Sequence, residues 1–166
     1  MSDRTAYILV TGSRSLRSYG RVADALDQAW TEAVQNGYNR LVVVHGAASG
    51  ADSMAERWVQ KHQARGVEQR RFPADWSADC SDKCQPGHRR PRAQGGTYCP
   101  TEGNFRNQRM VDHVLANAEP GGMLCIAVFA QAHSPGTADC SRRAEKAGIP
   151  TRRLGNPPAV KGGPNA

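Results

Sequence analysis

Three short glycine-bearing segments constrain this chain most, because each follows a run of apolar residues and precedes a pattern of helical spacing. The segments are residues 11–14, 45–52 and 134–139, and the apolar runs before them are residues 7–10, 41–44 and 123–129. Strands that pass into helices through glycines bring unpaired backbone N–H groups and the positive ends of helix dipoles to one edge of a sheet, where phosphate binds. The pattern is therefore typical of a nucleotide-binding protein.

Apolar residues recur at helical spacing in four segments, which lie at residues 22–34, 51–59, 110–115 and 138–147. Short apolar runs that alternate with such helices are typical of βαβ units, whose strands are parallel and buried. We therefore expect an α/β fold, a Rossmann-like three-layer sandwich with a parallel sheet. Because crossovers in such sheets are right-handed, the loops after successive strands gather at one edge, and the three glycine segments line a common crevice.

Length and charge limit the organisation of the chain and its partners. With 166 residues the sequence is long enough for one domain, which we place at residues 1–154, followed by a disordered tail rich in Pro and Gly at residues 155–166. A formal net charge of +7 favours an anionic partner. Because no apolar stretch approaches membrane-spanning length, we expect a cytoplasmic protein with no membrane partner.

Residues 77–104 interrupt the alternation, since they contain almost no aliphatic side chain. Within them Cys80, Cys84, His88 and Cys99 have the composition of a small metal site, and we predict that they bind one structural Zn²⁺ that orders an inserted loop. Four ligands would complete a tetrahedron and leave no position for a catalytic water. The alternative is a surface loop with scattered thiols. Cys125 and Cys140 fall in apolar patterns and are expected in the core.

Five short motifs resemble one known family. They are V-T-G-S-R at residues 10–14, V-H-G-A-A-S-G-A-D at 44–52, P-A-D-W at 73–76, R-N-Q-R-M-V-D at 106–112 and G-T-A-D at 136–139. In this order they resemble the YspA-type branch of the SLOG superfamily, which is related to YpsA and more distantly to the LOG phosphoribohydrolases. The resemblance spans most of residues 7–151. It implies a Rossmann-like fold, often oligomeric, that recognises nucleotides or nucleotide-derived ligands.

Some relatives in that superfamily cleave the N-glycosidic bond of nucleoside monophosphates with an arginine and a glutamate. Arg106 corresponds to the arginine, in a motif that is matched in part, whereas Cys140 stands at the position of the glutamate. Asp139 is the adjacent carboxylate, although one residue of helix rotates a side chain by about a quarter turn or more. The resemblance therefore implies Arg106 and Asp139 as the candidate catalytic pair and leaves turnover open.

The predicted ligand-binding residues come from the loops that follow the strands and from the segment around Arg106. Backbone N–H groups of Gly12 and Ser13, with the Ser13 hydroxyl and Arg14, are expected to hold a phosphate. Asp52 is expected to accept hydrogen bonds from ribose hydroxyls or to cap a helix. The complete set is Gly12, Ser13, Arg14, Gly46, Ser49, Gly50, Asp52, Arg106, Asn107, Gly136 and Thr137. The alternative is that these are turn glycines and solvated charges.

Three functions are compatible with these observations. The first is a binding or sensing protein for a nucleotide or a nucleotide-derived ligand. The second is a nucleoside 5′-monophosphate phosphoribohydrolase. The third is single-stranded nucleic-acid binding through Lys83, Arg89, Arg90 and Arg92, which is less favoured because only Tyr98 and Phe105 supply aromatic rings nearby.

Overall fold

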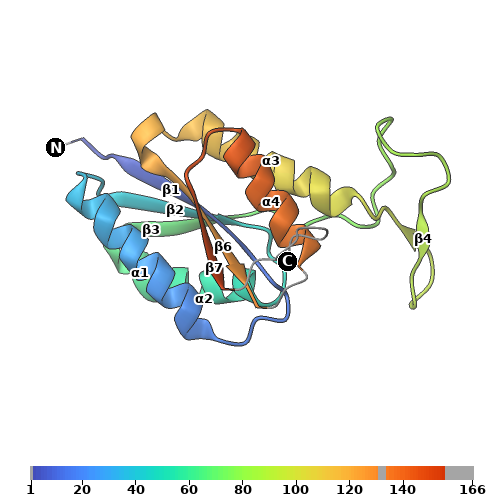
Figure 1. Ribbon diagram of the computed structural model, residues 1–166, viewed down its shortest axis with the longest axis horizontal. Helices are drawn as coiled ribbons and strands as arrows, with labels where there is room; N and C mark the ends of the chain where they lie inside the picture. The colour runs from blue at the N-terminus through green and yellow to red at the C-terminus, as the bar shows by residue number, and fades with distance from the viewer. Residues whose placement is uncertain (1, 131–133, 156–166) are drawn as a thin grey trace, which may run out of the picture.

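The computed structural model describes residues 2–130 and 134–155, and these form a parallel α/β sheet covered by helices on both faces (Figure 1). The five-stranded sheet has the order β3-β2-β1-β6-β7, with every pairing parallel. Its strands are β1 (Thr5–Gly12), β2 (Arg40–His45), β3 (Val67–Arg71), β6 (Met123–Phe129) and β7 (Thr151–Gly155). The predicted Rossmann-like three-layer sandwich is confirmed.

Four α-helices cover the sheet, two on each face. They are α1 (Tyr19–Gln35), α2 (Ala51–His62), α3 (Glu102–Asn117) and α4 (Pro135–Lys146); two short 3₁₀ turns lie at Gln63–Arg65 and Pro120–Gly122. The helices α1 and α2 pack into one apolar core with the sheet, and α3 and α4 pack into a second core on the other face. This arrangement buries both faces of the sheet.

The central strand β1 shows why its sequence is continuously apolar rather than alternating. Ile8 and Val10 contribute to the core beneath α1 and α2, whereas Leu9 contributes to the core beneath α3 and α4. All three side chains are at most 2% exposed. Since neighbouring residues of a strand point to opposite faces, a strand covered on both faces needs apolar residues at every position.

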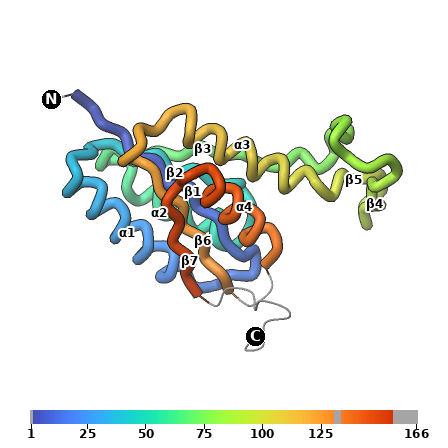
Figure 2. Tube along the Cα trace, turned by 45° about the horizontal axis from the view of Figure 1, so that its top comes forward, coloured from blue at the N-terminus to red at the C-terminus, as the bar shows by residue number. Residues whose placement is uncertain are grey.

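Residues 77–101 leave the body of the domain as a ribbon, which Figure 2 shows extended away from the sheet. The ribbon contains a small antiparallel pair, β4 (Arg90–Pro91) and β5 (Thr97–Tyr98). The helix α3 begins at Glu102, so residues 102–104 of the predicted insertion are its first turn. The sequence pattern does not predict this turn, because its residues are polar and the apolar face of α3 begins only further along the chain.

The edge strand β7 is absent from the sequence-based interpretation. It carries Arg152 and Arg153 and is only half-buried, so neither an apolar run nor a clear alternation marks it. Its identity comes from its parallel pairing with β6. Gly155, where the predicted tail begins, is its last residue, and residues 156–166 lie outside the described residues. None of the helices in the described ranges has the length and hydropathy to cross a membrane.

Candidate functional site: a pocket at the sheet edge and a Cys/His cluster

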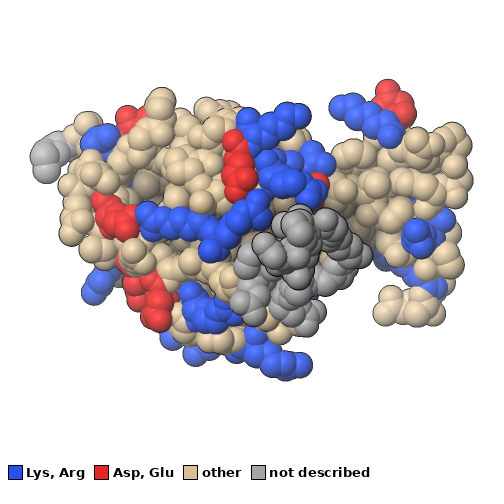
Figure 3. All heavy atoms as spheres, viewed as in Figure 1, with Lys and Arg blue, Asp and Glu red and all other residues tan. Residues whose placement is uncertain are grey.

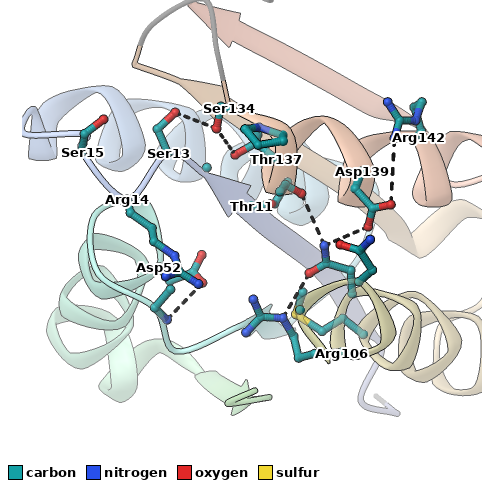
Figure 4. Close-up of a pocket in the computed structure, with 18 of the residues that line it drawn as sticks. Thr11, Ser13, Arg14, Ser15, Asp52, Arg106, Ser134, Thr137, Asp139 and Arg142 are labelled. Carbon is teal, nitrogen blue, oxygen red and sulfur yellow. Dashed lines mark hydrogen bonds and ion pairs between the residues drawn. The ribbon is translucent and has the colours of Figure 1, made fainter. Parts of the chain in front are cut away.

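A pocket of about 660 Å³ opens at the carboxyl ends of β1 and β6 (Figure 4). After β1 the chain passes to α1 on one face of the sheet, and after β6 it passes to α4 on the other face. In open α/β sheets this topological switch point is where ligands bind. The lining comes from residues 11–15, Ala48, Asp52, Trp76, Pro100, 103–104, 106–107, Met110, 134–137, Asp139 and Arg142.

A chain of hydroxyl groups joins the loop after β1 to the start of α4. The Oγ atom of Ser13 accepts a hydrogen bond from the Ala130 N–H at 3.0 Å and donates to the Ser134 Oγ at 3.0 Å. Ser134 in turn donates to the Thr137 Oγ1 at 2.7 Å, and the Ser13 N–H donates to the Val128 carbonyl at 3.0 Å. Ser13 therefore lies in the predicted pocket, with its N–H and hydroxyl engaged in holding the two loops together.

The N-terminus of α4 offers free backbone donors to this pocket. Pro135 occupies the first helical position, and the first helical bond runs from the Ala138 N–H to the Ser134 carbonyl at 3.0 Å. The N–H groups of Gly136 and Thr137 have no acceptor among residues 2–130 and 134–155. Free N–H groups and the positive end of the helix dipole make this end of α4 suited to an anion.

Gly50 brings the loop after β2 against the loop after β1. Its φ angle of +73° favours glycine, and a Cβ atom there would stand 2.6 Å from the Arg14 carbonyl oxygen. The adjacent Ala51 N–H donates to the Ser13 carbonyl at 3.3 Å. This close approach leaves the Arg14 side chain exposed at the mouth of the pocket, with its guanidinium 5.6 Å from the centre of the Trp76 ring.

Arg106, Gly46 and Asp52 form a buried cluster beneath the pocket. The Nη1 atom of Arg106 donates to the carbonyls of Gly46 at 2.6 Å and Phe72 at 3.1 Å. The Oδ2 atom of Asp52 accepts from the backbone N–H groups of Gly46 at 3.1 Å and Ala48 at 3.2 Å. Arg106 can occupy this position only beside a glycine, since a Cβ at residue 46 would overlap Nη1 of Arg106 and stand 2.5 Å from its Cζ.

Burial acts in opposite directions on the two charged members of this cluster. It raises the pKa of the Asp52 carboxyl, against His45, Arg106 and the two N–H donors, which favour the carboxylate. It lowers the pKa of the Arg106 guanidinium, against the attraction of Asp52. Asp52 is the second residue of α2, and Gly50 is the cap residue of that helix. The Asp52 carboxylate anchors the preceding loop, because it accepts hydrogen bonds from Gly46 and Ala48.

Asn107 links Arg106 to the carboxylate of Asp139. Its Oδ1 atom accepts from the Arg106 Nε at 3.0 Å, and its Nδ2 donates to the Asp139 Oδ2 at 3.0 Å. Arg143 also donates to that oxygen at 2.9 Å. The next residue, Cys140, is fully buried in the core, and burial raises the pKa of its thiol to about 12. The Asp139 carboxylate is therefore held by two donors at Oδ2, and its neighbour in the chain is an inert thiol.

The pocket brings together most of the predicted ligand residues and adds others. Gly12, Ser13, Arg14, Asp52, Arg106, Asn107, Gly136 and Thr137 line it, whereas Gly46 and Gly50 shape its loops and Ser49 is exposed outside it. Sequence reasoning did not place Trp76 in the site, although it quoted the motif P-A-D-W. An isolated tryptophan at the start of a segment without aliphatic residues was the available signal.

The predicted metal ligands converge in the ribbon. The ligand atoms of Cys80, Cys84, His88 and Cys99 all lie within 4.8 Å of one another. The Sγ atoms of Cys84 and Cys99 are 3.8 Å apart. A Zn–S bond of about 2.3 Å in a tetrahedron requires thiolates about 3.8 Å apart, so the cluster fits a tetrahedral metal.

Two further side chains support this cluster from outside. The Thr101 hydroxyl lies 3.5 Å from the Cys84 Sγ and 3.3 Å from the Cys99 Sγ. Hydrogen bonds from Thr101 first, and then from Ser81 and Cys99, lower the pKa of the Cys84 thiol to about 7. The Arg89 Nη1 donates to the Cys80 Sγ at 3.5 Å. Donors of this kind stabilise thiolates and orient metal ligands. The residues present therefore suit a soft divalent ion.

Comparison with known proteins gives two findings. A model of the YspA, cpYpsA-related SLOG family matches residues 6–78, which contain β1, β2, β3 and the loops after them. The Gene 61 protein of Mycobacterium phage D29 is 33% identical over 153 residues, which cover 91% of this chain and 98% of that protein. The second match extends over both sides of the pocket.

Proposed function

Because the chain belongs to the YspA, cpYpsA-related SLOG family, we propose that it binds a nucleotide or nucleotide-derived ligand at the carboxyl edge of its sheet, as a binding or sensing protein. The observation that carries this proposal is the position of Arg106. Its Nε and Nη1 atoms donate to protein acceptors, but its Nη2 has no acceptor among the described residues.

The free Nη2 is accessible to solvent rather than sealed in the core. Every side-chain nitrogen or oxygen buried from solvent in the described ranges has a hydrogen-bond partner, so Nη2 must be open to solvent. Because Arg106 lines the pocket, its remaining N–H groups meet whatever occupies it. With the free N–H groups of α4, they favour a phosphate held between two donor sets.

The net charge agrees with an anionic ligand. Lys and Arg side chains gather on the face seen in Figure 3, both on the body of the domain and on the ribbon. Arg142 lies on α4 at the rim of the pocket and is exposed. Such a field raises the local concentration of phosphate-bearing molecules.

The same geometry supports binding more than N-glycosidic hydrolysis. Asp139 would have to serve as the carboxylate, yet its Oδ2 is engaged by Asn107 and Arg143. Single-stranded nucleic-acid binding is also less supported, because Arg89 donates within the ribbon to Thr97 and to the Ala78 carbonyl. We further propose that the metal is zinc and that its role is structural, since four protein ligands leave it no open position.

Native mass spectrometry of the full chain with a pool of nucleoside monophosphates, dinucleotides, NAD and ADP-ribose derivatives tests the proposal. We expect one retained nucleotide and one zinc ion per chain. In a titration, the Arg142→Gln variant should bind the retained nucleotide more weakly than the parent does. The Arg65→Gln variant, changed at an exposed position before β3 on the opposite edge of the sheet, should bind it with unchanged affinity. Zinc without any nucleotide would overturn the nucleotide proposal.

A further inference from the structure

A second hollow of about 670 Å³ lies between the ribbon and the body of the domain. It shares Arg14, Trp76 and Pro100 with the ligand pocket, so the two spaces are contiguous. The ribbon supplies its other walls, which are residues 91–94 and Tyr98. We call this space the ribbon hollow. The family model matches residues 6–78, so of this lining it covers Arg14 and Trp76 but not the walls that the ribbon supplies.

Two aromatic rings meet in the ribbon hollow. The rings of Trp76 and Tyr98 have centroids 6.1 Å apart and stand at 82° to each other, and both side chains are half-buried. The Cys99 N–H donates to the Trp76 carbonyl at 3.1 Å, so a metal ligand fixes the backbone of one ring and adjoins the other. Partly exposed, rigidly held rings are platforms for a flat apolar group such as a nucleobase.

Each ring is accompanied by a guanidinium group. Arg14 lies 5.6 Å from the centre of the Trp76 ring, and Arg92 lies 6.0 Å from the centre of the Tyr98 ring. No carboxylate lines the hollow, and neither arginine forms an ion pair within residues 2–130 and 134–155. Uncompensated cations beside exposed rings match a group that is both planar and anionic, which is the chemistry of a nucleotide.

We infer that the ribbon hollow is a second nucleotide subsite, and that the ligand of this protein is a free dinucleotide. This inference rests on the proposed function. One nucleotide occupies the pocket with its phosphate near α4 and Arg106, and the second base packs on Trp76 and Tyr98. Arg14 belongs to both spaces and contacts the phosphate between them.

A longer strand is less well matched than a dinucleotide. A strand needs a row of cations beyond the second base, but the Arg89 guanidinium is turned inward, where it donates to the Thr97 carbonyl at 3.0 Å and its hydroxyl at 2.8 Å. Of the basic residues of the ribbon, Arg92 alone lines the hollow, whereas Lys83, Arg89 and Arg90 lie outside its lining.

Calorimetric titration of the full chain tests this assignment. The probes are the best-binding ribonucleoside 5′-monophosphate of the four, the 5′-phosphorylated dinucleotide of the same base, and the corresponding dodecanucleotide. We expect the dinucleotide to bind at least about tenfold more tightly than the mononucleotide. Arg92→Gln and Tyr98→Leu should each weaken the dinucleotide about five- to tenfold and leave the mononucleotide within about twofold.

Controls and contrary outcomes separate this inference from the proposed function. Arg65→Gln removes an equal charge on the opposite edge of the sheet and should change neither affinity, and metal content should be unchanged in all variants. Equal affinity for mono- and dinucleotide would overturn the second subsite alone. Much tighter, steeply salt-dependent binding of the dodecanucleotide would overturn it in favour of a strand. No binding of any of these probes would overturn the dinucleotide assignment, whereas the proposed function would be overturned only if the wider pool with NAD and ADP-ribose derivatives also failed to bind.

Discussion

Gly46 lies between two charged side chains beneath the pocket, and its lack of a side chain allows both to approach its backbone. It separates the carboxylate of Asp52 from the guanidinium of Arg106 and bonds to both through its own backbone. Any side chain at this position would occupy the volume of the guanidinium. The glycine therefore allows a buried arginine to reach under the loop and keep one amino group for the pocket.

Substitution Gly46→Ala should displace Arg106. We expect the free energy of unfolding to fall by about 1–3 kcal/mol, because a Cβ overpacks a buried site, and nucleotide affinity to fall more than tenfold. Thermal denaturation and calorimetric titration measure the two effects. Gly20→Ala, in the first turn of α1 where the nearest atom to a Cβ is 4.0 Å away, is the matched control and should be neutral in both. Unchanged affinity in Gly46→Ala would contradict a role for Arg106.

Asn107→Asp should introduce a like-charge pair, since the residue faces the Asp139 carboxylate at 3.0 Å. Two such carboxylates share a proton, so one pKa of the pair rises in the folded state. A group whose pKa is raised in the folded state stabilises the fold at low pH, and this contribution is lost as the pH rises through the folded-state pKa. The variant should therefore be less stable than the parent at pH 7 and approach the parent as pH falls toward about 4.

Melting temperatures measured across this pH range check the sign of the effect. The control is Asn117→Asp at the exposed end of α3, which adds the same charge without a carboxylate partner in the described residues. If the melting temperature of Asn107→Asp is below that of the parent by the same amount at every pH, the amide acts through its shape rather than through charge.

At the scale of elements, the ribbon and α3 are joined through the Cys/His cluster. Cys99 and Thr101 immediately precede α3, and the helix carries Arg106 and Asn107 in its second turn. The ribbon buries little apolar surface of its own: most of its side chains are exposed, and Cys99 is its one fully buried residue. A bound metal would supply the ordering energy that a core supplies elsewhere.

Metal removal should therefore loosen the ribbon and leave the sheet intact. Treatment with a chelator, or substitution Cys84→Ser, should abolish zinc binding and raise amide hydrogen exchange in residues 77–101, with little change in β1, β2 and β6. Cys125→Ala, a cysteine buried under α4, should retain one zinc ion per chain. Elemental analysis with hydrogen exchange measures both. Global exchange after chelation would contradict an independently ordered sheet.

At the scale of the whole molecule, two structured parts meet around one pocket. The sheet and helices present backbone N–H groups at the switch point, and Pro100 of the ribbon and Trp76 just before it line the other side. One oxygen of each carboxylate near Arg106 is engaged within the described residues, since Oδ2 of Asp52 and Oδ2 of Asp139 each accept two hydrogen bonds from the protein. This composition favours retention of a ligand over its cleavage.

We accordingly expect no release of free base from any nucleoside 5′-monophosphate. Chromatography after prolonged incubation of the full chain with each mononucleotide measures this. Base release above the uncatalysed rate, and its loss in Asp139→Asn, would instead establish the phosphoribohydrolase alternative. Gln108→Glu, at a half-buried position of α3, is the control, because it changes a neighbour of Arg143 that lies outside the pocket lining.

Much of the fold was predictable because buried parallel strands appear in the sequence as short, continuous runs of apolar residues. The runs ending at Val10, Val44 and Phe129 correspond to β1, β2 and β6, and the helical spacings correspond to all four helices. The first turns of α3 and the strand β7 were not predictable, because polar residues occupy them. Those elements owe their stability to neighbours: Thr101 and the cluster precede α3, and β6 pairs with β7.

The sequence by itself determined the layered fold, the family and the four residues of the Cys/His cluster, since each depends on local composition or on spacing along the chain. Only the tertiary structure decided which donors remain free. Ser13 donates its N–H to Val128, whereas Nη2 of Arg106 and two N–H groups at the start of α4 have no acceptor within residues 2–130 and 134–155. It also decided that Trp76 and Arg14 meet at the junction of two hollows. A hydrogen-bond partner or a ring contact depends on residues distant in the chain, and no pattern within a segment records it.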